Sequence, residues 1–470
     1  MVINHNFQDL FETLSGTKVL NLPTYKENAL KINFQSSDEQ KTVYKGQKPL
    51  LPFAASEVFH APISGWRRLT AAVDKNYKIV YEINFDIKGS NLNFRPGDTI
   101  GVIPENSQSE VDCVIEHLDL KDVADCDYVL SIDSTQKSGR VPAHLPVEST
   151  LRHVLTHCVD LRGVLKKLFL LTLSKHTKDE KEKRILEYLC SKEGAIAYTT
   201  HIINKHTCLL DIFAIFPSCK PPVVVILENL PRLLPRPYSI ANCDESSIKI
   251  CFSVIDIGNN RKGLTTGWLE RIIIRHNSSI EEEMKNLNIN ISNIEKKIPI
   301  YIRKNINDFR LPENLETPII LIGPGTGVSP FIGFLEERKY LYKVNPEVKM
   351  GYAWLFFGCR NPKLDFIYEK ELDEFVLDGV LNKLTTSFSR CGNTENHYVQ
   401  DAIHQNGEEL TKLLLQGAHV YICGDIKKMA PSVKEAIVQC IAKYGDKAND
   451  AEQFVEDMIK EKRYILDIWN

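Results

Sequence analysis

The sequence predicts a multi-domain protein in which an antiparallel β-domain is interrupted by a helical segment and followed by an α/β domain with a parallel sheet. Three observations support this fold class. Alternating apolar and polar residues, as in KIVYEINFDI, predict strands from about 55 to 102 and again from about 223. From about 107 to 220, apolar residues recur every three or four positions, which is typical of helices. From residue 299 onwards strands alternate with helices, and this alternation predicts a parallel sheet covered on both faces.

The elements of the first two thirds follow in order. Residues 1 to about 50 are polar and lack apolar periodicity, which predicts a linker or extension with little core of its own. FRPGDTIGVIP then places a Pro-Gly turn between two extended runs, and CVIEHLDL, TLRHVLTHCVDLRGVLKKLFLLTL and KEKRILEYLC predict helices. PPVVVILENL, PRPYSIAN and SIKICFSVIDI predict strands, and TGWLERIIIR predicts a helix. The polar stretch from about 277 to 297 indicates a surface loop.

The last third reads as strand and helix in turn. PIILIG, AWLFFG, KLTTSFS and HVYICG predict strands, while PFIGFLEERKYLYK, YEKELDEFV and YVQDAIHQ predict the helices between them. A long final helix is expected after HVYICG.

Length, composition and charge limit the classes of protein to which the chain can belong. The chain has 470 residues, 43% of them hydrophobic, which predicts two or three globular domains. A net charge of −3 provides no basic field for nucleic acid or anionic membrane. None of the 12 cysteines forms a C-x-x-C pair, which argues against a zinc ribbon, an iron–sulfur cluster or a disulfide framework, and no metal site is expected. Without a signal peptide pattern or a bilayer-length apolar run, a cytoplasmic location is expected.

A glycine loop, Gly323-Pro324-Gly325-Thr326-Gly327, follows the apolar strand PIILI and precedes a helix. Such a loop lets backbone N–H groups approach a pyrophosphate, whose charge the helix N-terminus favours. It is not the G-x-G-x-x-G fingerprint, because Val328 fills the last glycine position. Alone, the loop also fits a tight strand-to-helix turn that needs glycines for steric reasons.

A family resemblance is carried by seven motifs in order: PRPYSIAN, KGLTTGWL, GPGTGVSPFIGF, FFGCR, SFSR…YVQ, YICGD and DIWN. Together they resemble the ferredoxin–NADP reductase-like modules of diflavin reductases over roughly residues 51 to 470. The resemblance implies an NADPH-dependent flavoprotein oxidoreductase. It also implies a linker (1–50), an antiparallel FAD-binding β-barrel (51–106 and 223–303), an inserted helical connecting domain (107–222) and an NADPH-binding α/β domain (304–470).

The FAD contacts implied by the resemblance lie in two segments. Arg236 offers a planar cation for the flavin pyrophosphate, Tyr238 an aromatic face for the isoalloxazine, and Ser239 a hydroxyl near the flavin N5. Without the other motifs, R-x-Y-S would simply fit a strand with an exposed arginine. The family's second phosphate loop matches Gly263, Leu264, Thr265 and Thr266.

The coenzyme contacts point to a phosphorylated dinucleotide. Ser389 and Arg390 end the predicted strand KLTTSFS, where an arginine beside a hydroxyl suits a 2′-phosphate, whereas NAD sites usually carry an acidic residue. A surface Ser-Arg pair is the alternative. Relatives carry a lysine just before the matching tyrosine, where this chain has Asn396-His397. The resemblance further assigns to the coenzyme site Gly325, Thr326, Gly327, Tyr398, Gln400 and Asp425.

The hydride site is expected to bring together residues from distant segments. By resemblance, Ser239, Cys423 and Asp467 surround the nicotinamide, and Trp469 covers the flavin face until the coenzyme displaces it. Cys423 is expected to act by hydrogen bonding and packing, and Asp467 to stabilise positive charge on the ring. A terminal tryptophan that anchors an element in an apolar groove is the alternative for Trp469.

Finer resemblance points to one branch of the diflavin reductases. CVDLRGVLKKLFL, LCSKEGA, FPSCKPP, AWLFFGCR and EKRYILDIWN resemble the branch that serves methionine synthase, which implies reductive reactivation of its cobalamin. Such enzymes carry an FMN-binding flavodoxin-like domain, for which residues 1 to 50 offer no phosphate loop, so FMN is expected only on a separate or missing domain. Two alternatives stay open: another diflavin reductase serving a haem protein or sulfite reductase, and a catalytically silent interaction scaffold.

Overall fold

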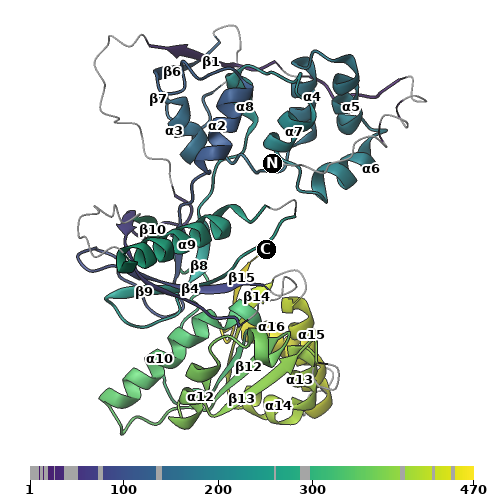
Figure 1. Cartoon of the computed structure of the whole chain (residues 1–470). Helices are drawn as coiled ribbons and strands as arrows, with labels where there is room; N and C mark the ends of the chain where they lie inside the picture. The colour runs from purple at the N-terminus through teal and green to yellow at the C-terminus, as the bar shows by residue number, and fades with distance from the viewer. Residues whose placement is uncertain are drawn as a thin grey trace. The chain divides into compact units, whose positions relative to one another are not determined.

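The fold is described from a computed structural model of the whole chain (Figure 1). The structure describes residues 10, 14, 19–25, 27–35, 51–71, 78–133, 140–258, 261–285, 297–391, 397–425, 429–445 and 450–469. The chain divides into two compact units, each assembled from three separate stretches. Unit 1 comprises Met1–Leu51, Pro104–Pro235 and Asp256–Leu269, and unit 2 comprises Pro52–Ile103, Arg236–Ile255 and Glu270–Asn470.

Unit 1 is mostly helical and surrounds one apolar core. Leucines and isoleucines from separate helices, such as Leu155, Leu170 and Ile212, are fully buried in this core. The apolar repeat of three and four predicted helices from about 107 to 220, because it places apolar side chains on one face. The helices of the unit are α2 (Gln108–His117), α3 (Leu151–His157), α4 (Lys167–Lys175), α5 (Glu180–Cys190), α6 (Ala195–Tyr198), η1 (Thr199–Ile203), α7 (Leu209–Ile215) and α8 (Val223–Asn229), of which α8 lies beyond that range.

A small antiparallel sheet in unit 1 departs from the linker expected for the first 50 residues. Strand β1 (Leu30–Phe34) pairs with β6 (Asp127–Ile132), which pairs with β7 (Glu148–Thr150). Leu30 is 4% exposed in the core, and the Glu228 carboxylate accepts its backbone N–H at 3.2 Å. The described part of this segment is therefore integrated into unit 1, because its few apolar residues gain both a strand partner and a core.

Helix α8 corrects the strand expected for PPVVVILENL. Val223, Val225, Ile226 and Leu227 are all buried, and the helix begins after Pro222. A short apolar run does not distinguish a fully buried strand from a buried helix, and a proline at the start favours a helix N-terminus. Tertiary burial on several sides thus overrides the strand preference of consecutive valines.

Two antiparallel sheets form the first part of unit 2. One has the order β2 (Phe59–Ala61), β10 (Ile298–Ile302), β5 (Thr99–Val102) and β8 (Arg236–Ser239), and the other the order β3 (Ile63–Arg68), β4 (Val80–Asp86) and β9 (Ser247–Ser253). An isolated bridge between Ile240 and Ile250 links the end of β8 to β9. The predicted antiparallel strands are therefore present, and they place the Arg236–Ser239 segment in a defined register against β5.

Helix α9 (Leu264–Lys285) begins in unit 1 and continues into unit 2. It confirms the helix predicted at TGWLERIIIR. The surface loop expected from about 277 is wrong as far as Lys285, where the backbone is still helical, and residues 286–296 lie outside the described residues.

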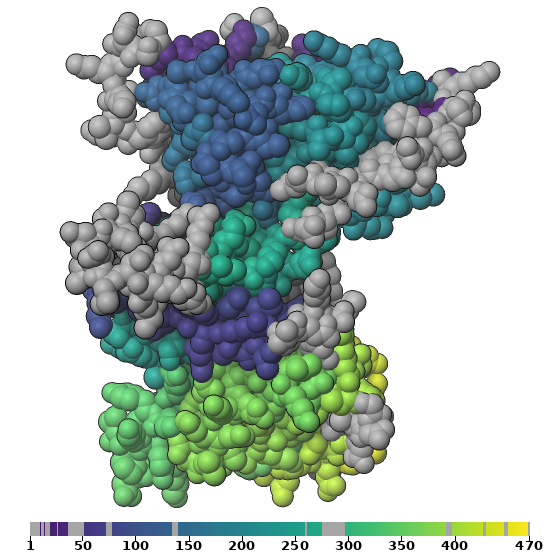
Figure 2. Space-filling model, in the orientation of Figure 1, coloured from purple at the N-terminus to yellow at the C-terminus, as the bar shows by residue number. Residues whose placement is uncertain are grey.

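A five-stranded parallel sheet forms the rest of unit 2, as predicted. Its order is β13 (Lys383–Phe388), β12 (Ala353–Cys359), β11 (Ile319–Ile322), β14 (His419–Asp425) and β15 (Tyr464–Trp469). The accompanying helices are η2 (Gly325–Val328), α10 (Ser329–Val344), α11 (Pro362–Asp365), α12 (Glu369–Leu377), α13 (Val399–Gln405), α14 (Gly407–Leu415), α15 (Met429–Tyr444) and α16 (Ala451–Lys460). Figure 2 shows this part as a continuous body of light-green and yellow atoms.

Both faces of the parallel sheet are covered. Alternate residues of β11 point to opposite sides: Ile319 and Leu321 join the core under α10 and α12, whereas Ile320 and Ile322 join the core under α13 to α16. This alternation is the strand period of two, and it explains why the strand reads as a continuous apolar run.

The last segment corrects the long final helix. Two helices, α15 and α16, are followed by β15, which lies parallel to β14. Lys462 adopts a left-handed backbone (φ 56°) just after α16, which ends the helix before the strand. None of the helices in the described ranges combines the length and apolar character that crossing a bilayer requires.

Candidate functional site

The glycine loop lies at the carboxyl end of β11 and continues into η2, which begins at Gly325. Gly325 has a left-handed backbone (φ 57°), which glycine adopts without steric cost. At Gly327 a Cβ atom would lie 2.2 Å from the carbonyl oxygen of Cys423. The absence of a side chain at Gly327 therefore lets the loop reach the end of β14, where the hydride site is expected.

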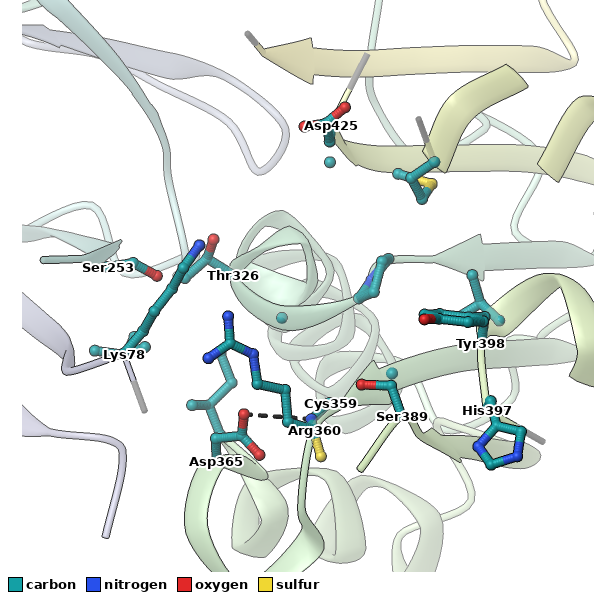
Figure 3. Close-up of a pocket in the computed structure, with 18 of the residues that line it drawn as sticks. Lys78, Ser253, Thr326, Cys359, Arg360, Asp365, Ser389, His397, Tyr398 and Asp425 are labelled. Atoms are coloured by element: carbon teal, nitrogen blue, oxygen red, sulfur yellow. Dashed lines mark hydrogen bonds between the residues drawn. The ribbon is translucent and has the colours of Figure 1, made fainter. Parts of the chain in front are cut away.

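A cavity of about 610 Å³ opens beside this loop within unit 2 (Figure 3). The glycine loop, the ends of β12 and β14, the turn after β13 and the start of α13 line it, together with residues in or next to β4, β9, α11 and α15. Ligands of parallel sheets bind outside the carboxyl ends of the strands, and the cavity lies there. The predicted coenzyme residues that line it are Gly325, Thr326, Ser389, Tyr398, Gln400 and Asp425. Two predicted residues, Gly327 and Arg390, are not among its lining residues.

Two positively charged side chains in the cavity lining, Lys78 and Arg360, were not predicted from the sequence. Figure 3 shows the Lys78 ammonium and the Arg360 guanidinium directed towards Thr326. Lys78 precedes β4, in the antiparallel part of the unit, and the sequence alone carries no signal that it reaches the glycine loop. Arg360 directly follows β12 within the motif FFGCR, so its place at a strand's carboxyl end was the available signal. Both suit a pyrophosphate lying along the loop.

The turn after β13 is held against the end of β12. The backbone N–H of Ser389 donates to the carbonyl of Cys359 at 3.0 Å, and that of Arg390 to the carbonyl of Arg360 at 2.9 Å. These bonds fix the Ser389 hydroxyl at the cavity, whereas Arg390 is exposed.

Tyr398 presents its ring at the cavity from the N-terminus of α13. Its side chain is 58% exposed, and its backbone N–H donates to the Asp401 carboxylate at 2.8 Å. His397, at the position next to the missing lysine, also lines the cavity, and Asn396 lies outside the described residues. An exposed aromatic held by a helix cap is suited to stacking on an adenine ring.

The residues predicted for the hydride site lie around one carboxylate oxygen, Oδ2 of Asp467. The Ser239 hydroxyl donates to Oδ2 of Asp467 at 2.6 Å, and the Cys423 thiol approaches the same oxygen at 3.8 Å. Three strands supply these residues, because β8 carries Ser239 while Cys423 and Asp467 are register partners on β14 and β15. The structure thus brings together residues that are up to 228 positions apart in the sequence, and their role at the nicotinamide stays a prediction.

Burial governs the protonation of this cluster. It raises the pKa of Asp467, while the hydrogen bonds from Ser239 and Cys423 and the nearby charge of Arg303 act in the opposite direction. Burial also raises the pKa of Cys423 well above its usual value, and the adjacent Asp467 adds to this effect. Cys423 is therefore a neutral thiol at neutral pH, suited to donating a hydrogen bond and unsuited to nucleophilic attack.

Strand β8 also presents the predicted flavin contacts. Arg236 and Tyr238 are half-buried, and β8 pairs with β5 so that Tyr238 lies opposite Ile100. The Tyr238 ring packs edge-on against Phe252 at 6.3 Å, and burial raises the pKa of its hydroxyl. This packing fixes the ring plane, which a flavin-stacking role requires.

The second phosphate loop, Gly263 to Thr266, lies in unit 1 at the start of α9. Thr265 is 4% exposed, and its hydroxyl has no hydrogen-bond partner among the described residues. A buried hydroxyl without a partner is costly, and a phosphate oxygen bound at this helix N-terminus would satisfy it. The residues present therefore fit the pyrophosphate of FAD.

Trp469 contributes backbone to β15, but its side chain lies outside what the structure describes. Its predicted flavin-covering role is therefore not located. Across the described ranges, no group of three or more histidine, cysteine or acidic side chains is arranged to hold a metal ion.

Comparison with known proteins identifies the family. An FAD binding domain model matches residues 51–268, and an oxidoreductase NAD-binding domain model matches residues 321–435. The chain is 36% identical to methionine synthase reductase of Homo sapiens over 474 residues, covering 96% of this chain and 66% of the relative. It is 35% identical to that of Rattus norvegicus over 492 residues, covering 99% of this chain and 70% of the relative. The chain belongs to the diflavin reductase family.

The diflavin reductases also include more distant matches. NADPH–cytochrome P450 reductase of Homo sapiens is 31% identical over 439 residues, covering 91% of this chain and 60% of the relative. The chain spans about two thirds of the length of the methionine synthase reductases that it matches. As a diflavin reductase, it carries the FAD-binding and NADP-binding domains of an NADPH-dependent flavoprotein oxidoreductase.

Proposed function

We propose that this chain takes electrons from NADPH through FAD to an FMN-binding flavodoxin-like partner domain. When bound, NADPH supplies a hydride and FAD accepts it and releases electrons singly. One observation carries the proposal: the Ser239 hydroxyl and the Cys423 thiol both lie against Oδ2 of Asp467. This cluster lies beside the glycine loop, which is suited to binding a pyrophosphate.

Each residue of that cluster has a distinct role in the proposal. Asp467 holds negative charge where positive charge develops on the nicotinamide, and a buried carboxylate exerts this effect strongly. Ser239 orients the carboxylate through its 2.6 Å hydrogen bond, and the neutral Cys423 thiol packs beside it. Substrate orientation and charge stabilisation, rather than covalent catalysis, are the contributions of the protein.

The remaining contacts belong to the same proposal. Ser389 and Arg390 recognise the 2′-phosphate, and Tyr398 and Gln400 hold the adenosine. Arg236, Tyr238 and the loop from Gly263 to Thr266 bind FAD. We further infer the domain division given by the family resemblance, with an FAD-binding barrel (51–106 and 223–303), a helical connecting domain (107–222) and an NADPH-binding domain (304–470).

The final acceptor proposed is the cobalamin of methionine synthase. Supporting this branch, identity to the methionine synthase reductases is 34% to 36%, against 31% to 32% for the cytochrome P450 reductases. A cytoplasmic location is part of the proposal, since all 12 cysteines are free thiols.

The decisive experiment purifies the chain, measures bound flavin by absorbance and assays NADPH-driven ferricyanide reduction. We expect stoichiometric FAD and rapid turnover, and Asp467→Asn to slow flavin reduction while the exposed Asp457→Asn does not. A flavin-free, inactive protein would favour the silent scaffold. Reactivation of methionine synthase after an FMN domain is added then separates the two reductase branches: failure there, with ferricyanide activity intact, would indicate another acceptor.

Trp469 provides a separate prediction. If its ring covers the flavin, Trp469→Ala removes the group that the nicotinamide must displace, so kcat/KM for NADH should rise relative to that for NADPH. Steady-state kinetics with both coenzymes measure this ratio. An unchanged ratio would show that Trp469 does not gate the flavin.

A further inference from the structure

Two ion pairs in unit 1 converge on the residues directly before the second phosphate loop. Arg261 and Lys262 precede Gly263, and each is held by an arginine-carboxylate pair that reaches into the helical part of the unit. Such pairs are uncommon in protein interiors, because charged side chains are rarely buried without a specific partner.

The first pair joins the loop to α7. The Arg261 guanidinium is 7% exposed and binds both oxygens of Asp211, whose side chain is 1% exposed. The same guanidinium donates to the Cys208 sulfur at 3.0 Å, and Asp211 also accepts the backbone N–H of Cys208 at 2.9 Å. Arg261 is thereby fixed between the first turn of α7 and the loop.

The second pair joins the loop to α2. Arg162 donates from Nε to Glu110 at 2.7 Å, and from Nη1 to the backbone carbonyl of Lys262 at 2.5 Å. The side chains of Arg162 and Glu110 are 11% and 3% exposed. Glu110 is itself fixed at the start of α2, because its carboxylate accepts the Ser107 backbone N–H at 3.4 Å and the Ser107 hydroxyl at 2.8 Å.

The energetics of buried ion pairs bear on their role. Desolvation cancels most of the attraction, so well-packed apolar residues of similar volume give comparable stability. Stability alone therefore does not explain two such pairs at adjacent positions, whereas a directional, bidentate contact does fix backbone geometry. The geometry fixed here is that of a loop with a buried, unpartnered Thr265 hydroxyl and a 2.7 Å Gly267-to-Gly263 backbone bond.

We propose that Arg162–Glu110 and Arg261–Asp211 are positioning residues that hold the Gly263–Thr266 loop in its FAD-binding conformation, so that α2 and α7 set the affinity for FAD. The proposal rests on the FAD-binding role of this loop. Both guanidinium groups are engaged by carboxylates, so they act through the loop and not as ligands of the flavin phosphates. The FAD binding domain match, which includes α2 and α7, is consistent with this role.

The test replaces each pair while keeping its helix cap. Arg162→Met with Glu110→Gln retains a capping-box residue, and Arg261→Met with Asp211→Asn retains an acceptor for Cys208 N–H. The matched control is Arg152→Met, which removes a half-buried arginine paired with Asp112 and Asp125 in the same unit. Three quantities are measured on flavin-free protein: the FAD Kd by quenching of flavin fluorescence, the 2′,5′-ADP Kd by calorimetry, and the melting temperature.

We expect each double variant to bind FAD about tenfold or more weakly, the loss that one or two misplaced hydrogen bonds produce. The 2′,5′-ADP Kd and the melting temperature should stay close to those of the original protein, and the control should match it in all three. Unchanged FAD affinity in a folded double variant overturns the proposal.

Two further outcomes are distinguished. If a double variant does not fold, Arg162→Lys alone decides by the same FAD Kd, because it keeps a cation beside the buried Glu110 but lacks the guanidinium fork that also reaches the Lys262 carbonyl. If the original protein binds no FAD, the proposed function fails. If the original protein and the variants bind FAD with the same Kd, only the positioning role is refuted.

Discussion

At the scale of single residues, the carboxylate of Asp467 is the centre of the proposed hydride site. Burial raises the pKa of Asp467, and the hydrogen bond from Ser239 opposes it first, followed by the contact with Cys423 and the charge of Arg303. The proposed chemistry needs the ionised form. The pH range of hydride transfer should therefore report directly on the Ser239 contact.

Ser239→Ala removes the donor that favours ionised Asp467, so the pKa of Asp467 rises further. Activity that needs the carboxylate is then lost at a higher pH as the solution is acidified. The acid limb should move upwards by about one to two pH units, since a hydrogen bond to a charged group is worth about 1.5–3 kcal/mol. Stopped-flow flavin reduction against pH measures it, with Ser253→Ala, which lines the cavity but lacks this contact, as control. An unmoved acid limb would contradict this role of Ser239.

A second residue-scale prediction concerns Lys78. Figure 3 shows it at the end of the cavity away from Ser389 and Tyr398, near the glycine loop, so it should contact the pyrophosphate that NADPH and NADH share. Lys78→Ala should raise KM for both coenzymes roughly threefold to tenfold, because an exposed ionic contact is worth about 1 kcal/mol.

The control for Lys78 is Lys88→Ala, an exposed lysine beyond the other end of β4. Ser389→Ala, by contrast, should raise KM for NADPH alone. Steady-state kinetics with both coenzymes test this pattern, and a Lys78 variant that affects only NADPH would place the lysine at the 2′-phosphate.

At this scale, the sequence pointed to some residues of the proposed site and missed others. Ser239, Cys423 and Asp467 were predicted as a group because each ends or begins a recognisable motif. Lys78 was missed because its role depends on the antiparallel strands lying beside the glycine loop, a long-range contact that no local pattern encodes. Arg360 was visible within FFGCR but lacked a reason to be singled out until its guanidinium was seen in the cavity.

At the scale of elements, close backbone approach at the glycine loop is the feature that positions the site. A Cβ at Gly327 would meet the Cys423 carbonyl at 2.2 Å, whereas Gly325 has nothing within 4 Å of its Cβ position. Glycine is thus required at the two positions for different reasons. Gly327 leaves room for the Cys423 carbonyl, and Gly325 adopts a left-handed backbone.

Gly327→Ala should therefore lower the free energy of unfolding by about 1–3 kcal/mol or more, through overpacking against β14. Gly325→Asn should change it by less than about 1 kcal/mol, because asparagine tolerates the left-handed region. Thermal or denaturant unfolding of the two variants compares them. Equal destabilisation would show that the approach of the loop to β14 is not tight.

Local patterns predicted most elements, and their failures share a cause. The valines of α8 read as a strand, but burial on several sides makes them helical. The segment at Leu30 was predicted to be a linker, but it pairs with β6 and donates a backbone hydrogen bond to the Glu228 carboxylate. Strand β15 read as helix, since its partner β14 lies 44 residues away in register. In each case a distant partner decided the structure.

At the scale of the whole molecule, the residues of the coenzyme cavity all belong to unit 2. Coenzyme binding should therefore not require FAD. Flavin-free protein should bind 2′,5′-ADP with a Kd within roughly threefold of the FAD-bound protein, as expected for independent sites. Calorimetry on both forms tests this, and a loss of binding in the flavin-free form would show that the cavity depends on the flavin.

The two units are interleaved along the chain, and this has a consequence for synthesis. Strands β2 to β5 leave the ribosome long before their partners β8 to β10, and synthesis of the interval from Ile103 to Ile302 takes on the order of tens of seconds. Throughout that time the early strands have unpaired edges, which invite pairing with other nascent chains. Completion of either unit is thus a late event in translation, and the early strands depend on chaperones more than the size of either unit alone would suggest.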